Sequence, residues 1–174
     1  MAKDLHKIWG HRWLTPKAKP GKSKIHGWGT FAIKDIKAGE IIRVIGGIVL
    51  QKKDLEKYHQ LIGEKYETRI SGDFFLAPSR KEEVTKESGM LNHGCNPNVG
   101  FGDTITIVTI RNIKTGGELV ADYAMDGLPI EPFICKCGSA NCRKIIKPDD
   151  WKNPEIRKKY GSRYFAPFLK KRFV

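Results

Sequence analysis

Three cysteines near the C-terminal end of the chain have a spacing that predicts metal chemistry. They lie in the segment CKCGSANC, as Cys135, Cys137 and Cys142. In a chain without a sign of secretion, this spacing is typical of metal thiolates and not of a disulfide framework. Structural zinc is held by four nitrogen or sulfur ligands, so a residue from elsewhere in the chain must complete the site.

The segment LNHGCNPNVG, residues 91–100, offers the missing ligand. Its glycine, proline and asparagines predict a turn, but a turn requires neither a histidine nor a cysteine. Cys95 is the one cysteine that remains, and His93 and His59 are the alternative ligands. A zinc ligand at Cys95 would connect this loop to the C-terminal cysteines.

The composition predicts one globular domain. The chain has 174 residues, of which 40% are hydrophobic and 10% aromatic, which is enough for a core in its middle and leaves the ends more loosely packed. No apolar run approaches the roughly 20 residues that a bilayer requires, and the start lacks the apolar stretch of a signal peptide. We therefore expect an intracellular protein with no membrane partner, nuclear and chromatin-associated in a eukaryote or cytoplasmic in a prokaryote.

The net charge of +13 gathers towards the two ends of the chain. The segments KAKPGKSK and IRKKYGSRYFAPFLKKRF carry much of it. Such clusters favour acidic partners, nucleic acid among them. The alternative is that these lysines and arginines only solvate two surface segments, and the salt dependence of binding separates the two interpretations.

Short strands are predicted by β-branched runs that glycines interrupt. The candidate strand regions are 27–36, 39–50, 69–78, 103–113 and 116–124. Region 69–78 reads as a pair of strands around a Ser-Gly-Asp turn. The expected architecture is mostly β with short helices.

Two short helices are expected. Leu55, Tyr58 and Ile62 share one helical face within 52–62. The segment NPEIRKKYG, residues 153–161, offers an asparagine N-cap, a proline at the first helical position and a glycine stop.

Four separated motifs then agree on one family. GWGTFA, NHGCNPN, GGELVADY and CKCGSANCRK resemble, in this order, the signatures of SET-domain protein-lysine methyltransferases with a post-SET zinc-binding cysteine cluster. The resemblance implies a fold of small β-sheets in which the Asn-His segment threads, knot-like, beneath the loop near the C-terminal tyrosine. It divides the chain into a basic N-terminal lead-in (1–24), a SET domain (25–125), a post-SET zinc segment (126–147) and a basic C-terminal helical tail (148–174).

The resemblance also implies roles for individual residues. Tyr123 matches the catalytic tyrosine, and the cofactor would be S-adenosylmethionine. The residues implied to bind it are Lys24, His26, Gly27, Trp28, Gly29, Asn92, His93 and Phe133. The implied substrate is a lysine of a protein, such as a histone, a ribosomal protein or another protein associated with nucleic acid. Structural zinc would be bound by the four cysteines.

Two positions depart from the family pattern in the substrate channel. Val44 and Ile45 stand where a Glu-Tyr pair is usual, so an aromatic wall is missing beside the target lysine. Ala121 replaces an aromatic residue two positions before the catalytic tyrosine, and the smaller side chain predicts that higher methylation states are allowed. Three phenylalanines could refill this space: Phe74, Phe75 and Phe101.

Two other functions are consistent with the motifs. A catalytically silent, zinc-stapled module could use the positive surface to bind nucleic acid or chromatin, and cofactor binding discriminates against it. Methyl transfer to a residue other than lysine is the second, and analysis of the product distinguishes it.

Overall fold

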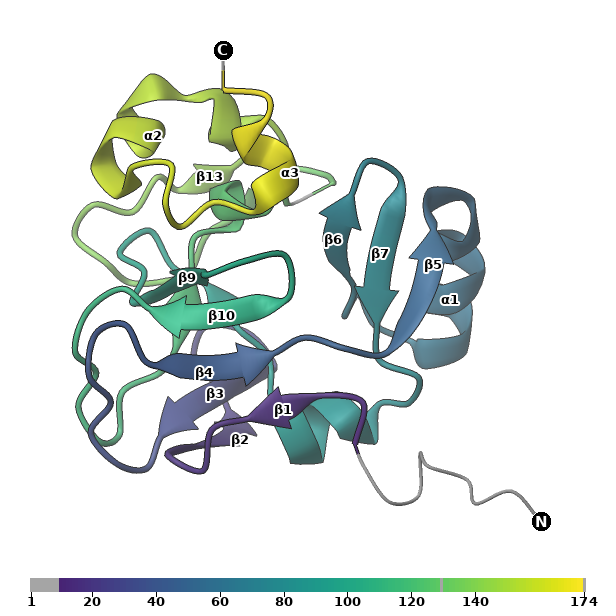
Figure 1. Ribbon diagram of the computed structural model, residues 1–174, viewed down its shortest axis with the longest axis horizontal. Helices are drawn as coiled ribbons and strands as arrows, with labels where there is room; N and C mark the ends of the chain where they lie inside the picture. Colours follow the sequence, from purple (N-terminus) through teal and green to yellow (C-terminus); the bar gives the residue numbers. More distant parts are fainter. Residues whose placement is uncertain (1–9, 129, 174) are drawn as a thin grey trace.

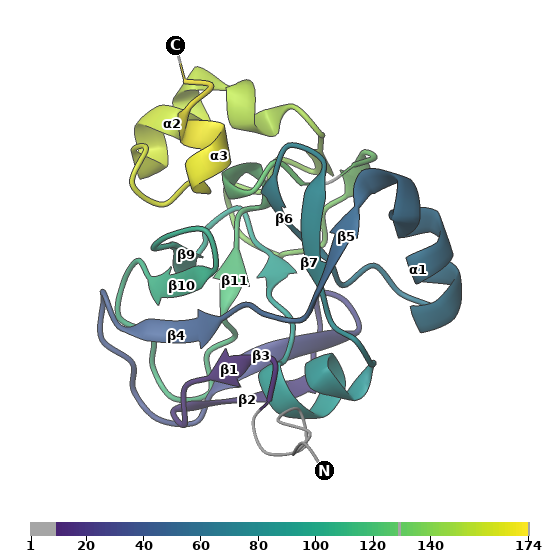
Figure 2. The ribbon, with the colours of Figure 1, turned by 45° about the vertical axis from the view of Figure 1, so that its right-hand side comes forward.

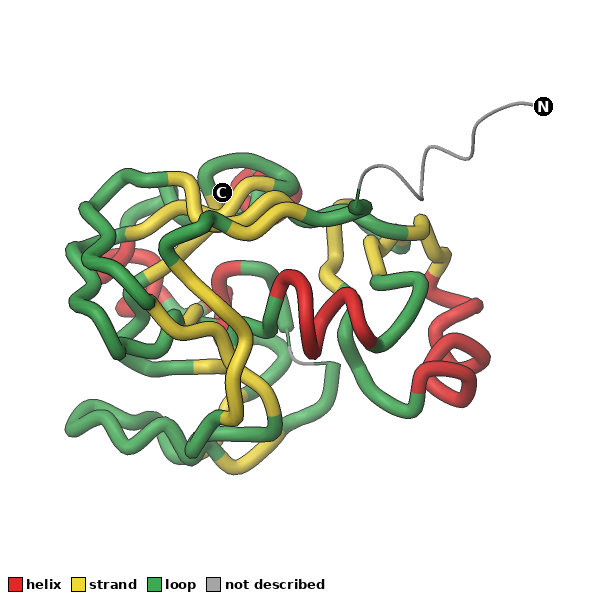
Figure 3. The backbone as a smooth tube through the Cα atoms, turned by 90° about the horizontal axis from the view of Figure 1, so that it is seen from below, coloured by secondary structure: helices red, strands yellow, loops and turns green. Residues whose placement is uncertain are grey.

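The computed structural model describes residues 10–128 and 130–173, so the first nine residues of the predicted lead-in lie outside the described part. The strands are β1 (Trp13–Leu14), β2 (Ala18–Lys22), β3 (Trp28–Ala32), β4 (Ile41–Val44), β5 (Ile48–Gln51), β6 (Thr68–Ser71), β7 (Phe74–Ala77), β8 (Asn92–His93), β9 (Val99–Phe101), β10 (Thr106–Thr109), β11 (Val120–Ala121), β12 (Phe133–Ile134) and β13 (Ile145–Ile146). The α-helices are α1 (Leu55–Ile62), α2 (Pro154–Tyr160) and α3 (Pro167–Lys170). Strands and loops predominate over helices, as Figure 3 shows, which confirms the predicted fold class.

The largest sheet has the strand order β1-β4-β10-β9-β11-β8 (Figure 1). Its central strand β10 is the apolar and threonine-rich run expected within 103–113, and Ile107 and Thr109 are buried in it. At the far side β11 pairs in parallel with β8, so that Val120 faces Asn92 and Ala121 faces His93. The Asn-His segment therefore lies against the segment that leads to Tyr123, as the resemblance implies.

A hairpin of β2 and β3 carries the Gly-Trp-Gly motif. Its turn is closed by a hydrogen bond from the Ser23 amide to the Gly27 carbonyl at 3.0 Å. Gly27 has a φ of 45°, in the left-handed region that favours glycine. The glycine is thus required by the turn that presents the motif.

The strands β5, β7 and β6 form a separate sheet that lies with α1 at one side of the molecule (Figures 1 and 2). Region 69–78 forms the expected strand pair, with a register shift between Arg69 and Ser71. Helix α1 buries Leu55 and Tyr58 and ends at Gly63, which has a φ of 77°. We call β5, α1, β6, β7 and the loops between them, residues 48–77, the insert.

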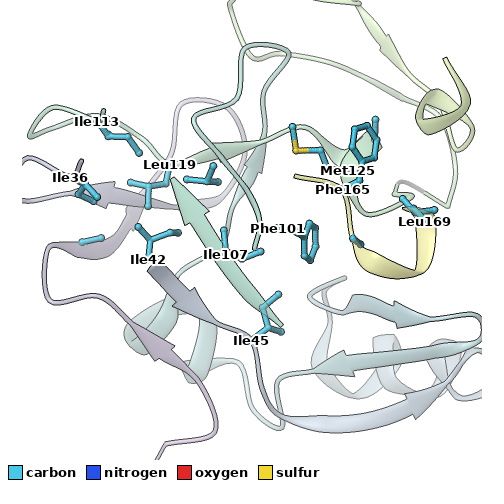
Figure 4. Close-up of a cluster of buried hydrophobic side chains, with 14 of the residues drawn as sticks. Ile36, Ile42, Ile45, Phe101, Ile107, Ile113, Leu119, Met125, Phe165 and Leu169 are labelled. Atoms are coloured by element: carbon cyan, nitrogen blue, oxygen red, sulfur yellow. The ribbon is translucent and has the colours of Figure 1, made fainter. Parts of the chain in front are cut away.

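The main hydrophobic core extends into the C-terminal segment. Figure 4 shows Phe165 and Leu169 beside Met125, in the same cluster as Ile107 and Leu119. The prediction that the C-terminal end is loosely packed is therefore wrong. Among its basic residues the segment contains apolar side chains, and their burial fixes it against the sheet.

Helix α2 forms where the sequence predicts it. The Asn153 side chain accepts a hydrogen bond from the Glu155 amide at 2.9 Å, and Gly161 follows the last helical residue. Within the described ranges, no helix combines the length and the apolar character needed to cross a bilayer.

Candidate active site and metal centre

A cavity of about 980 Å³ opens between the insert, the Gly-Trp-Gly turn and the segment around Phe133. Most of the predicted site residues line it: His26, Gly27, Trp28, Ile45, Asn92, His93, Ala121, Tyr123 and Phe133. Lys24 and Gly29 do not line the cavity. Its size is at the upper end of the range for small-molecule sites.

Asn92 fixes the backbone of the Gly-Trp-Gly turn. Its side-chain amide nitrogen lies 3.1 Å from the carbonyl oxygens of His26 and Trp28 and 2.8 Å from Oε1 of Glu118. Asn92 is buried, so these hydrogen bonds form away from competing water. The asparagine that the sequence predicts to bind cofactor therefore holds the turn that lines the cavity.

Glu118 also supports this turn, a role that the sequence motifs do not predict. Its other oxygen, Oε2, accepts a hydrogen bond from the Ser23 hydroxyl at 3.0 Å, which ties the start of the turn to the same carboxylate. A side chain at position 29 would overlap Glu118 Oε1. Gly29 thus acts indirectly, since it leaves space for the carboxylate that Asn92 contacts. The only sequence signal was the position of Glu118 in the motif GGELVADY.

His93 connects the tyrosine segment to the cysteines. Its Nδ1 accepts a hydrogen bond from the Tyr123 amide at 3.2 Å, and its Nε2 lies 3.3 Å from Sγ of Cys95. Burial lowers the pKa of His93 to about 4, so the ring is neutral at physiological pH. The acceptor role of Nδ1 assigns the ring proton to Nε2, where it faces the sulfur.

Tyr123 presents its ring to the cavity. Its hydroxyl donates a hydrogen bond to the Leu91 carbonyl at 3.1 Å, and its ring packs at an angle against His93 and Phe133. Burial raises the pKa of Tyr123, so the hydroxyl keeps its proton. The geometry suits an orienting hydroxyl and not a base.

The four cysteines converge on one point. The sulfur atoms of Cys95, Cys135, Cys137 and Cys142 all lie within 4.8 Å of one another, and those of Cys95 and Cys135 are 3.9 Å apart. Tetrahedral zinc with sulfur ligands at about 2.3 Å would place the sulfurs about 3.8 Å apart. Burial raises the pKa of Cys95 to about 11 and raises that of Cys135 as well, so these two thiolates need a cation nearby, whereas hydrogen bonds lower the pKa of Cys137 to about 6. The donor set fits zinc.

Neither alternative ligand completes this set. His59 lies on α1, where its Nε2 is 3.0 Å from Oε2 of Glu67 in the cavity wall. His93 directs Nε2 at a sulfur and Nδ1 at a backbone amide, which leaves neither nitrogen for a metal.

A buried ion pair next to Tyr123 was also missed. The side chain of Asp122 is fully buried, and the guanidinium of Arg143 donates to both of its oxygens at 2.6 and 2.7 Å. The Tyr160 hydroxyl lies 3.1 Å from Asp122 Oδ2 and 3.2 Å from the Cys95 carbonyl oxygen. Helix α2 thereby holds the tyrosine segment and the Cys95 loop together. These partners are far apart in the sequence, so no local pattern predicts them.

One of the three candidate phenylalanines lines the cavity. Phe101 lines the cavity together with Ile45 and Ala121. Phe74 is 44% exposed, and Phe75 is buried in the insert without lining the cavity. Phe101 is therefore the residue that could limit the space left by Ala121.

Comparison with known proteins agrees with the arrangement of the site. The family profile of the SET domain matches residues 27–124. "Histone-lysine N-methyltransferase set1" of Dictyostelium discoideum is 31% identical over 139 residues, which cover 72% of this chain and 9% of the relative. "Histone-lysine N-methyltransferase SETD1B" of Homo sapiens is 30% identical over 157 residues, 82% of this chain and 8% of the relative. This chain thus spans less than a tenth of the length of either relative.

A solved structure has the same fold. The crystal structure of KRYPTONITE in complex with mCHG DNA and SAH superposes with a TM-score of 0.56 at 22% identity, and the match covers 74% of this chain and 28% of that one. The matched family segment spans the Gly-Trp-Gly turn, the Asn-His pair and Tyr123, which are the elements that meet at the cavity. The chain belongs to the SET domain family.

Proposed function

We propose that this protein transfers methyl groups from S-adenosylmethionine to lysine side chains of a protein substrate. The observation that carries the proposal is the convergence of the Asn92-held turn, His93 and Tyr123 on one cavity. Relatives that bear the name histone-lysine N-methyltransferase support it, as does the presence of SAH in the KRYPTONITE complex.

The cofactor would lie against the wall formed by the turn at His26–Trp28, the Asn92–His93 pair and Phe133. When bound, it supplies a methyl group on a positively charged sulfur. The residues of the chain provide position and exclude water: the backbone of the turn is fixed, His93 stays neutral, and the Tyr123 hydroxyl points at a carbonyl near the reacting region. Attack by an amine then depends on alignment and on the amine's loss of its proton.

Zinc bound by the four cysteines would order one wall of this cavity. Cys135 lines the cavity itself, and β12 with Phe133 immediately precedes it. β12 pairs with β13, which follows Cys142. A metal bound by Cys135 and Cys142 would therefore hold in place the chain segment that carries Phe133. We infer that metal loading and cofactor binding are coupled.

The proposed acceptor is a histone or another protein associated with nucleic acid, which would place the protein at chromatin. The names of the relatives support the histone, and the basic C-terminal end supports a contact with nucleic acid. The last turn of α2 carries Arg157, Lys158 and Lys159. We expect the affinity for a DNA duplex to fall steeply with added salt. The fall should be less steep for Lys158→Gln, which lacks one positive charge.

A labelling experiment tests the methyl transfer. Purified protein is incubated with radiolabelled S-adenosylmethionine, core histones and a cell extract, beside Tyr123→Phe and a chelator-treated sample. Tyr164→Phe is the matched control, because Tyr164 packs against the core and does not line the cavity. Labelled bands that persist in the control and disappear with Tyr123→Phe and with chelation are expected. Absence of transfer to every protein, together with absence of cofactor binding by calorimetry, would instead indicate the silent binding module.

A further inference from the structure

Asp126 places a carboxylate in the same cavity as Tyr123. Tyr123–Met125 form a single helical turn (η4), and Asp126 follows it directly. The Asp126 amide donates to the Tyr123 carbonyl at 3.4 Å, and the next residue, Gly127, has a φ of 71°. The chain reverses here, so Asp126 is among the residues that line the cavity.

The carboxylate has unused capacity to accept a proton. Its Oδ1 accepts a hydrogen bond from the Leu128 amide at 3.1 Å. Among the described residues, no side chain donates a hydrogen bond to it, in contrast to Asp122, which accepts from Arg143 and Tyr160. A carboxylate with one backbone partner can still bind a cation or a proton.

The surroundings of Asp126 favour a proton at near-neutral pH. The pKa of Asp126 is raised to about 7, chiefly by burial; the charge of Asp122 also acts to raise it, and the hydrogen bond from the Leu128 amide and the charge of Arg69 on β6 act to lower it. Arg69 is turned towards the ring of Phe75, whose centroid is 5.2 Å from its guanidinium carbon. On the wall formed by β4, buried Arg43 also lines the cavity.

We propose that Asp126 accepts the proton that the target lysine must lose before it attacks the methyl group. This inference rests on the proposed function. An N–H bond of the ammonium breaks and an O–H bond forms on Asp126, which leaves a neutral amine. The amine nitrogen then forms its bond to the methyl carbon as the sulfur–methyl bond breaks, and the proton on Asp126 passes to solvent. The positive charge of Arg43 disfavours the charged ammonium of the target lysine in the cavity, and so favours transfer of the lysine's proton to Asp126.

The other titratable groups near Tyr123 are less suited to this role. The Tyr123 hydroxyl keeps its own proton, and both ring nitrogens of His93 are engaged. Glu67 faces His59 on the insert. Asp122 also lines the cavity, but Arg143 and Tyr160 engage its two oxygens. Asp126 remains as the carboxylate near Tyr123 that lines the same cavity without a side-chain donor among the described residues.

The pH dependence of kcat/KM tests the assignment, with the acceptor that the labelling experiment identifies. In the unmodified protein, kcat/KM is expected to rise with pH through about 7, as Asp126 ionises. Asp126→Asn should lower kcat/KM by about 100-fold near pH 7.5. The deficit should shrink towards pH 10, where the lysine loses its proton without help. Asp126→Glu should recover part of the rate, and Asp73→Asn, which removes an exposed carboxylate from the β6–β7 turn, should match the unmodified protein.

A second readout does not require activity. In protein labelled with ¹³C at the aspartate carboxyls, the signal lost in Asp126→Asn should titrate near pH 7, while SAH binding measured by calorimetry stays unchanged. Because a buried carboxylate is destabilising when charged, Asp126→Asn should unfold at an equal or higher temperature at pH 8. An Asn variant with the original rate and pH profile, or a carboxyl that titrates near pH 4, would overturn the inference. Failure of methyl transfer in the unmodified protein would overturn the proposed function. The NMR titration requires no methyl transfer, so it tests Asp126 separately.

Discussion

The two walls of the cavity are built differently. The wall formed by the Gly-Trp-Gly turn and the Asn-His pair is fixed by the buried side chain of Asn92 and the carboxylate of Glu118. A second wall comes from the insert, at residues 63–68, and from the loop before Phe133. On that side Lys65 forms an ion pair with Glu131 at 4.0 Å, and these side chains are 67% and 80% exposed.

This difference separates two tasks. Hydrogen bonds in a buried environment hold one arrangement, whereas an exposed ion pair contributes little and allows neighbouring segments to move. We expect the first wall to be rigid and to bind the cofactor, and the second wall to adapt to the acceptor protein.

Removal of zinc should have the largest effect. Chelation, or Cys135→Ser, should abolish methyl transfer and cofactor binding, because the segment that carries Phe133 is then no longer held in place by the metal. Calorimetry with SAH and thermal unfolding measure the two consequences, and re-addition of zinc should restore both in the chelated sample. Full cofactor affinity without metal would show that the wall does not depend on the cysteines.

The buried ion pair behind Tyr123 should have the next largest effect. Asp122→Asn should lower the free energy of unfolding by about 3 kcal/mol, since it leaves Arg143 with weaker partners. The retained contact of Arg143 with Asp150 at 3.2 Å keeps the loss at the lower end of the usual range. Asp35→Asn is the matched control, because its pair with Lys114 has a similar distance, 2.7 Å, but is exposed. Equal changes in urea unfolding for the two variants would contradict this account.

Alanine substitutions at two glycines, one near each wall, compare the contributions of the two walls to SAH binding. Gly29→Ala should displace Glu118, weaken SAH binding by about tenfold and destabilise the protein by about 1–2 kcal/mol. Gly63→Ala, at the end of α1, should destabilise the protein by about 1 kcal/mol through its positive φ. Its SAH affinity should not change. Calorimetry and urea unfolding test both variants, and a loss of cofactor affinity in Gly63→Ala would remove the distinction between the walls.

The space beside Ala121 should control the extent of methylation. Mass spectra of the product at exhaustive turnover should show di- or trimethyllysine for the unmodified protein and mainly monomethyllysine for Ala121→Phe. Phe101→Ala should shift the product towards higher methylation, because Phe101 lines the same space. Monomethyl product alone from the unmodified protein would indicate that Phe101 already fills it.

The smallest effect is expected at the mouth of the cavity. Glu131→Gln removes the exposed pair with Lys65 and should leave the unfolding midpoint unchanged. The KM for the acceptor should change by no more than a few-fold, and SAH binding should stay the same. A large loss of stability would mean that the two sides of the mouth are rigidly joined.

The sequence predicted the first wall better than its supports. Local motifs in the sequence identify Gly27, Asn92, His93 and the cysteines. In the structure these residues meet at the cavity or at the cysteine cluster. Local motifs do not identify their supports, because Glu118, Asp122 and Arg143 act through partners that only the tertiary structure brings near. Lys24 was expected at the cofactor but does not line the cavity.

The C-terminal segment shows the same limit. Its sequence indicated a basic helical tail, and α2 forms as predicted. However, the basic character of the segment concealed Phe165 and Leu169, which complete the main core, and Tyr160, which contacts Asp122. Net charge describes the surface of such a segment but not which side chains are buried.

The most direct test of the central claim is the identity of the methylated residue. The protein is incubated with S-adenosylmethionine and its acceptor, and the acceptor is digested and examined by mass spectrometry, beside a sample with Tyr123→Phe. Methyllysine that forms with the unmodified protein and is lost in the variant is the predicted result. Methylation of another residue type, or methyllysine that forms equally in the variant, would contradict the account.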